Sequence, residues 1–118
     1  MSATGIVGII TVDCNDLEKV AGFWSALLGL AEKRRLPGYV FLDRICPGGP
    51  HLGFQQVPEP KTLKNRVHLD LGAPDPAALI TRAVELGATR LRDYDESGFR
   101  WTVLTDPEGN EFCIGAGG

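Results

Sequence analysis

Hydrophobic and polar residues follow two different rhythms along this chain, and each rhythm predicts a different kind of element. Residues 5–12 form a run of β-branched and apolar residues, which predicts a strand. Asn15 and Glu18 then have the spacing of a capping box, and Gly29 is typical of a helix end. Between them the apolar residues recur every three or four positions, which predicts a helix with one apolar stripe: Leu17, Val20, Ala21, Trp24, Leu27 and Leu28.

Three short strands are expected after this helix, and the whole pattern then starts again. The predicted strands cover residues 31–36, 39–42 and 51–57, with Pro- and Gly-containing turns between them. In the second half a strand is expected at residues 66–71. Asp75 and Pro76 then predict a helix start, and Gly87 its end. The predicted inward stripe of this helix is Ala77, Ile80, Ala83 and Val84, and the last strands are expected at residues 89–93, 100–105 and 111–114.

The two halves can be superposed on each other by their turn and cap residues. Asp16 matches Asp75 at an offset of 59, and Gly29 matches Gly87 at an offset of 58. Gly49 in the first half matches a glycine at an offset of 60. Such constant offsets indicate an internal duplication. We therefore predict a single α+β domain, residues 1–118, built from two tandem βαβββ repeats at about 5–57 and 66–115, with a connector at about 58–65.

Composition and charge exclude several functional classes. The 118 residues are 43% apolar and 23% charged, with a net charge of −3 and scattered basic residues, which argues against nucleic acid as a partner. No apolar run is long enough to cross a membrane, and residues 1–4 have no secretion signal. The three cysteines, Cys14, Cys46 and Cys113, have no Cys-x-x-Cys spacing, which predicts reduced thiols and a cytoplasmic protein.

Several short motifs resemble one family of proteins. They are Leu28-Gly29-Leu30, His68-Leu69-Asp70-Leu71, Leu86-Gly87-Ala88 and, as the most specific mark, Asp106-Pro107-Glu108-Gly109-Asn110-Glu111-Phe112. Over nearly its whole length the chain resembles the vicinal oxygen chelate superfamily, which includes glyoxalase I, extradiol dioxygenases, and fosfomycin and bleomycin resistance proteins. It looks closest to a small bacterial glyoxalase-like branch. The resemblance implies a cupped, mostly antiparallel sheet (the glyoxalase/bleomycin resistance/dihydroxybiphenyl dioxygenase fold) that holds a ligand on its inner face.

The resemblance also implies a metal site, whose four positions here are degenerate. Metal-dependent relatives place one ligand on the first strand and one on the last strand of each repeat. In this sequence those positions hold Ile9, then Gly53 or Gln55, then His68, and finally Cys113 where the family has Glu. Because this set offers too few oxygen and nitrogen donors for a catalytic divalent ion, we predict no metal cofactor.

A shifted metal site is the alternative. His51 shares a strand face with Gly53, and Glu111 shares one with Cys113, because side chains alternate along a strand. With His68 they would provide two histidines and one carboxylate, the ligand set of non-haem iron oxygenases. The competing interpretation, which we favour, is that His51 and Glu111 begin strands beside turns and face solvent.

The remaining candidates are side chains that would contact a ligand directly. Phe41 and Trp101 lie on matching strands of the two halves and are either the apolar wall of a pocket or sheet core. Gln55 offers both a hydrogen-bond donor and an acceptor. These three residues belong to the predicted ligand-binding set.

His68, Asp70 and Cys113 complete that set. Histidine is a general acid or base near neutrality, so His68 is the candidate catalytic residue; the alternative is a histidine retained from a metal-binding ancestor. Asp70 shares the face of His68 and either orients its ring or is solvated. Cys113 is either a nucleophile or, as we favour, a small buried thiol.

Three functions are compatible with these residues, and the sequence does not decide whether the protein is an enzyme. The favoured one is a metal-free protein that binds a small, partly apolar or aromatic molecule, as bleomycin resistance relatives do. The alternative is a glyoxalase-type lyase or isomerase, or a dioxygenase, that uses a divalent metal at His68 with His51 and Glu111. A regulatory module is the third. We expect a homodimer and no membrane partner.

Overall fold

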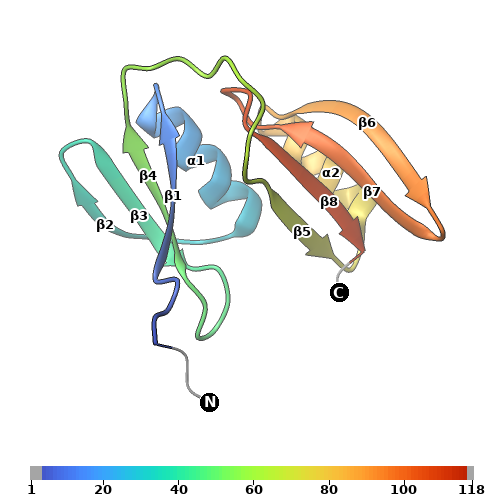
Figure 1. The fold of residues 1–118 in the computed structure, drawn as a ribbon, viewed down its shortest axis with the longest axis horizontal. Coiled ribbons are helices and arrows are strands. Elements are labelled where there is room, and N and C mark those ends of the chain that lie inside the picture. Colours follow the sequence, from blue (N-terminus) through green and yellow to red (C-terminus); the bar gives the residue numbers. More distant parts are fainter. Residues whose placement is uncertain (1–3, 117–118) are drawn as a thin grey trace. The chain divides into compact units, whose positions relative to one another are not determined.

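The computed structural model describes residues 4–116, which contain eight strands and two helices (Figure 1). The chain divides into two compact units, residues 1–60 and residues 61–118. Unit 1 corresponds to the first predicted repeat and unit 2 to the second. The prediction about a secretion signal concerns mostly residues 1–3, which lie outside the described residues. In the described part of the chain, neither helix is long and apolar enough to cross a membrane.

Unit 1 is a four-stranded mixed sheet with one helix. Its strands lie in the order β1-β4-β3-β2; β1 and β4 are parallel and the other pairs are antiparallel. Helix α1 packs against β3 and β4. The elements are β1 (Ile9–Cys14), α1 (Leu17–Leu28), β2 (Glu32–Leu36), β3 (Tyr39–Arg44) and β4 (His51–Gln56).

The cap of α1 differs from the prediction. The N-cap is Asp16, whose carboxylate accepts a hydrogen bond from the backbone N–H of Lys19. The side-chain amide of Asn15 instead donates to the carbonyls of Val57 and Glu59, 2.9 Å away in each case. Asn15 therefore ties the end of the repeat to its beginning, and a carboxylate occupies the positive end of the helix dipole. The predicted helix end is confirmed, because Gly29 has the left-handed conformation with φ 68°.

Unit 2 repeats this topology, so the predicted pair of βαβββ repeats is confirmed. Its strands lie in the order β5-β8-β7-β6, with β5 parallel to β8 and the other pairs antiparallel. Helix α2 packs against β5, β6 and β8. The elements are β5 (Leu69–Ala73), α2 (Pro76–Glu85), β6 (Thr89–Glu96), β7 (Phe99–Thr105) and β8 (Glu111–Ala116).

The apolar stripe of α2 is narrower than predicted. Its start is as expected, since Asp75 accepts a hydrogen bond from the N–H of Ala78 and proline follows the cap. Of the four predicted inward residues, only Ile80 and Ala83 are buried. Val84 is 46% exposed, and Ala77 is also exposed. A helix of ten residues that touches the sheet along a single i, i+3 row buries only the residues of that row.

Both first strands begin later than their apolar runs. β1 begins at Ile9 rather than at residue 5, and β5 begins at Leu69 rather than at residue 66. Each is a parallel partner of a strand that itself begins only after a turn, at His51 in β4 and at Glu111 in β8. The backbone N–H of Glu111 donates to the side chain of Asn65, which here replaces a ladder partner. The position where the partner strand begins, and not the local strand propensity, therefore sets where β1 and β5 start.

The motif that most resembles the family forms the turn before β8. The N–H of Gly109 donates to the carbonyl of Asp106 at 3.0 Å, as expected for the predicted turn. The Asp106 carboxylate is 2% exposed and accepts from the backbone of Glu108 and from both the backbone and the side chain of Asn110. This turn fixes the first residue of β8 and hence the side to which its alternate side chains point.

Candidate functional site

The two faces of the unit 2 sheet carry different chemistry. One face packs on α2 and is apolar, with Leu104, Phe112 and Ile114 at 1% exposed or less. Because side chains alternate along a strand, the residues between these point to the other side. We call that side the cavity face, because its side chains and Lys64 line a cavity of about 410 Å³: His68, Asp70, Arg92, Tyr94, Trp101, Val103, Glu111 and Cys113.

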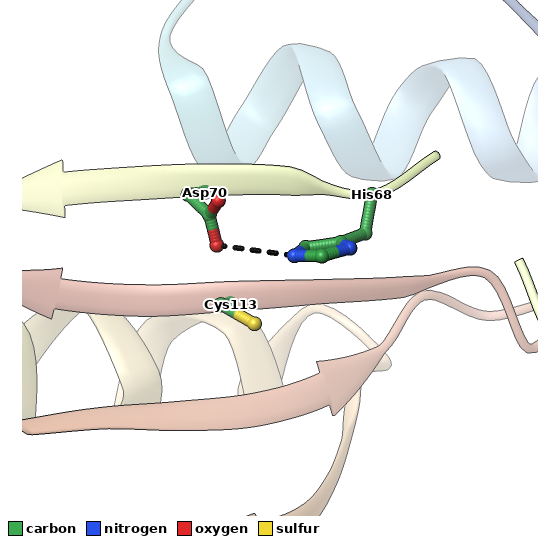
Figure 2. A group of neighbouring side chains, drawn as sticks. All are labelled: His68, Asp70 and Cys113. Carbon is green, nitrogen blue, oxygen red and sulfur yellow. Dashed lines mark ion pairs between the residues drawn. The ribbon is translucent and has the colours of Figure 1, made fainter. Parts of the chain in front are cut away.

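A cluster of three possible ligand donors lies at the β5 edge of the cavity face (Figure 2). Asp70 and Cys113 are direct neighbours in the β5–β8 ladder, and His68 lies two residues before Asp70. The Nε2 atom of His68 is 3.5 Å from a carboxylate oxygen of Asp70. The donor atoms of the three residues all lie within 4.8 Å of one another. The structure thus brings three of the six predicted ligand-binding residues into this cluster, and a fourth, Trp101, lines the same cavity.

Cys113 is a poor nucleophile in this environment. Burial raises the pKa of its thiol to about 11, and the nearby carboxylate of Asp70 acts in the same direction, partly by accepting a hydrogen bond from the thiol. The guanidinium of Arg92 opposes this increase without cancelling it. A thiol with such a pKa is almost fully protonated at neutral pH.

Glu111 and His51 are each engaged with a neighbour. The Glu111 carboxylate is 2.5 Å from the ammonium of Lys64, and this hydrogen bond lowers its pKa. Its side chain is 21% exposed and lines the cavity. In unit 1, His51 is half-buried and its Nδ1 lies 3.0 Å from the carbonyl oxygen of Leu42. Both residues begin strands as predicted, but neither side chain simply faces solvent.

An aromatic and cationic group forms the β6 side of the cavity face. Tyr94 and Trp101 are direct cross-strand partners, and their rings stack with centroids 5.1 Å apart and an interplanar angle of 17°. Arg92 donates from Nε to the hydroxyl of Tyr94, and its guanidinium carbon lies 5.6 Å from the centre of the Tyr94 ring. Trp101 therefore belongs to a stacked wall that borders the cavity, as one of its two predicted roles requires.

The corresponding face of unit 1 combines apolar residues with basic ones and His51. A second cavity of about 410 Å³ there is lined by Ile9, Lys33, Arg34, Leu36, Phe41 and His51. Phe41 stacks on Tyr39 with centroids 6.0 Å apart. A side chain at Gly53 would lie 3.0 Å from the Phe41 ring and 3.1 Å from Ile9, so the missing side chain is what lets these two residues close over the strand.

The strand registers decide between the two candidates for the first-repeat counterpart of Cys113. Asp70 lies opposite Cys113, and its counterpart Thr11 lies opposite Gly53. Gly53 is therefore the equivalent position. Gln55 lies two pairs further along, opposite Asp13 and Tyr39.

The residues present do not fit the four-ligand metal site of metal-dependent relatives. In unit 1, Ile9 and Gly53 offer no donor atom at the two equivalent positions. In unit 2 the positions hold His68 and Cys113, with Asp70 beside them. Ligand atoms around a tetrahedral zinc ion are roughly 3.3–3.8 Å apart. The spread of up to 4.8 Å in this cluster would have to close for the three residues to share an ion.

Four residues that line the cavity were not predicted from the sequence: Lys64, Arg92, Tyr94 and Val103. The predicted strand 89–93 ended too early, whereas β6 extends to Glu96. Continued alternation along residues 90–96 would have placed Arg92 and Tyr94 on one face. Lys64 precedes β5, and only its salt bridge with Glu111 shows that it lies beside the cavity.

The fold and a family profile define the class of protein. Two βαβββ units, each a four-stranded mixed sheet with one helix, make up the vicinal oxygen chelate architecture. The family profile described as "Glyoxalase-like domain" matches residues 9–115. The chain belongs to this glyoxalase-like family. No curated protein matches the sequence significantly.

Solved structures of similar fold include proteins described with different functions. A glyoxalase/bleomycin resistance protein/dioxygenase family enzyme from Burkholderia phytofirmans PsJN is 22% identical, with a TM-score of 0.78 over 95% of this chain and 98% of that one. The fosfomycin resistance protein FosX from Listeria monocytogenes, solved with Mn(II) and a dihydroxypropylphosphonic acid, is 16% identical, with a TM-score of 0.79 over 99% and 93%. Lactoylglutathione lyase from Agrobacterium tumefaciens is 21% identical, with a TM-score of 0.71 over 99% and 96%. At these identities the likeness concerns the fold alone.

Proposed function

We propose that this protein binds a small, partly aromatic molecule on the cavity face of unit 2, without a metal at the positions that metal-dependent relatives use. The observation that carries this proposal is the stacked pair Tyr94 and Trp101, which borders a cavity of about 410 Å³ together with polar side chains. Small-molecule sites have this size and this combination of aromatic surface with a few polar groups.

The donor set supports the metal-free form of this proposal. Ile9 and Gly53 replace two of the four family ligands with groups that coordinate nothing. The carboxylate of Glu111, a ligand in the alternative set, is already paired with Lys64. A ligand would therefore be held by stacking, ion pairing and hydrogen bonds rather than by a metal.

The direct test maps a fragment library onto the protein by amide chemical-shift changes in NMR spectra of the full chain. We expect aromatic fragments to shift amides of β5 to β8 around Trp101, and Trp101→Ala to weaken their binding. Val84→Ala is the control, because Val84 lies on α2, which packs on the other face of the sheet, and is 46% exposed. Shifts confined to other surfaces, or equal losses in both variants, would contradict the proposal.

A second candidate function is a metal-dependent reaction of glyoxalase or dioxygenase type, and one observation favours it. The donor atoms of His68, Asp70 and Cys113 lie within 4.8 Å of one another, and thiol, imidazole and carboxylate are all zinc ligands. Titration with Co²⁺ separates the candidates, since thiolate ligation produces a charge-transfer band that Cys113→Ser would abolish. Stoichiometric binding lost in both His68→Ala and His51→Ala would instead support the shifted site that includes His51 and Glu111.

Two further properties are proposed from the sequence. We propose a homodimer, the commonest symmetric assembly of such small domains. Light scattering coupled to size-exclusion chromatography tests it, and a monomeric mass over a range of concentrations would refute it. The three free cysteines support a reducing compartment, the cytoplasm.

A further inference from the structure

The cavity is lined by two cations, Lys64 and Arg92, and two carboxylates, Asp70 and Glu111, but only one cation has a close carboxylate partner. Lys64 and Glu111 neutralise each other at one side of the cavity. Arg92 donates from Nε to a neutral hydroxyl, that of Tyr94. Within residues 4–116, no carboxylate lies within ion-pair distance of the Arg92 guanidinium. A guanidinium has five N–H donors in a planar fork that matches a carboxylate, so most of this fork is available to a ligand.

The position of Arg92 relative to the aromatic wall is the second observation. Arg92 and Tyr94 lie two residues apart on β6 and so point to the same face, and Trp101 is stacked on Tyr94 from β7. The hydrogen bond to the Tyr94 hydroxyl and the 5.6 Å approach to its ring hold the guanidinium beside the stacked rings. A cation and a flat apolar surface are thus presented side by side.

We infer that the ligand is a planar aromatic molecule that carries a single carboxylate or similar anionic group. This inference rests on the proposed function and names the chemical class of its ligand. The ring packs on Trp101 above Val103, and the anionic group accepts hydrogen bonds from Arg92. Stacking and a bidentate charge-assisted pair reinforce each other here, because the first fixes the plane of the ligand and the second fixes its direction.

The opposite edge of the cavity face limits the ligand to one anionic group. In the strand order β5-β8-β7-β6, the edge strands β5 and β6 lie about 14 Å apart, given about 4.8 Å per strand step. Asp70 is on β5, and its carboxylate is 74% exposed next to the imidazole of His68. A second anionic group reaching this edge would face Asp70, whereas a hydroxyl or amine would donate to it. The ligand is therefore an aromatic monoanion whose far end is neutral or a hydrogen-bond donor.

The test uses three probes of similar size and compares their affinities by isothermal titration calorimetry on the full chain. Naphthoate carries both features, naphthamide lacks the charge, and cyclohexanecarboxylate lacks the aromatic plane. We expect naphthoate to bind up to about fivefold more tightly than naphthamide, since Arg92 is exposed and a solvent-accessible charge pair contributes up to this factor. We expect Trp101→Leu to abolish the preference for naphthoate over cyclohexanecarboxylate.

Two arginine variants assign the charge preference to one residue. Arg92→Gln is expected to make naphthoate and naphthamide bind equally, and Arg92→Lys to keep part of the preference because it retains the charge without the fork. Arg82→Gln removes the same charge from α2 and is expected to leave the ratio unchanged. Unaltered far-ultraviolet circular dichroism of each variant confirms that it is folded.

The results distinguish a wrong ligand class from a wrong assignment to Arg92 and from a wrong proposed function. If naphthamide binds as tightly as naphthoate and still shifts the amides around Trp101, the anionic class is wrong and the proposed binding function stands. If Arg82→Gln and Arg92→Gln reduce the ratio equally, the preference reflects overall charge and the assignment to Arg92 is wrong. If no fragment of any chemistry binds the cavity face, both the ligand class and the proposed function are refuted.

Discussion

Replacing Asp106 by alanine separates a structural role of the most family-specific motif from a ligand-binding role. The Asp106 carboxylate is 2% exposed and accepts three hydrogen bonds at 2.9–3.0 Å, two from backbone N–H groups and one from the side chain of Asn110. Hydrogen bonds to a charged group contribute about 1.5–3 kcal/mol each. Part of this is offset, because Glu108 and Asn110 are half-buried and water reaches them once the carboxylate is gone. We therefore expect Asp106→Ala to lower the free energy of unfolding by about 3 kcal/mol.

Urea denaturation followed by circular dichroism measures this loss as a shift of the midpoint at constant slope. Asp106→Asn keeps one acceptor oxygen and is expected to lose about half as much. Asp95→Ala is the control, since Asp95 pairs with Arg100 at the surface, with side chains 56% and 82% exposed, and such pairs contribute under about 1 kcal/mol. A loss below about 1 kcal/mol in Asp106→Ala, or a loss of probe binding at unchanged stability, would refute the structural interpretation.

Two further predictions test the chemistry and the packing of the sheet faces. Because the pKa of Cys113 is raised to about 11, its thiolate is scarce at pH 8 and increases as the pH approaches 11. Iodoacetamide followed by peptide mass spectrometry should thus modify the exposed Cys46 first and Cys113 only slowly; equal rates at pH 8 would show that Cys113 is neither buried nor protonated. Gly53→Ala places a methyl group 3.0 Å from the Phe41 ring and should destabilise the protein by about 1–2 kcal/mol, whereas Gly22→Ala, in open space on a helix, should stabilise it by up to about 1 kcal/mol. Thermal melts of both variants measure these effects. A change of stability in the same direction in both variants would contradict the packing described.

The architecture was predictable because it depends on features that one sequence carries locally. The helix ends at Gly29 and the turn at Gly109 require left-handed backbone, and both glycines mark the repeat. Local sequence patterns do not show which strands pair with each other. The starts of β1 and β5 depend on strands more than 40 residues away, and so both were placed too early.

The candidate site was predictable only where the alternation of side chains along a single strand determines which residues share a face. Alternation along β8 placed Glu111 and Cys113 on one face correctly. The stack of Tyr94 on Trp101 joins two strands whose register is shifted by an irregularity near Arg92, and no sequence spacing reveals it. The same holds for the pair of Lys64 and Glu111, which connects the segment before β5 to β8.

The most direct measurement is a crystal structure of the protein grown with naphthoate, with anomalous diffraction recorded above the absorption edges of manganese, iron and zinc. We expect a flat ring against Trp101 with its carboxylate at Arg92, and no anomalous peak at His68. A transition-metal ion coordinated by His68, with the aromatic acid absent from the cavity face or bound through that ion, would contradict this expectation.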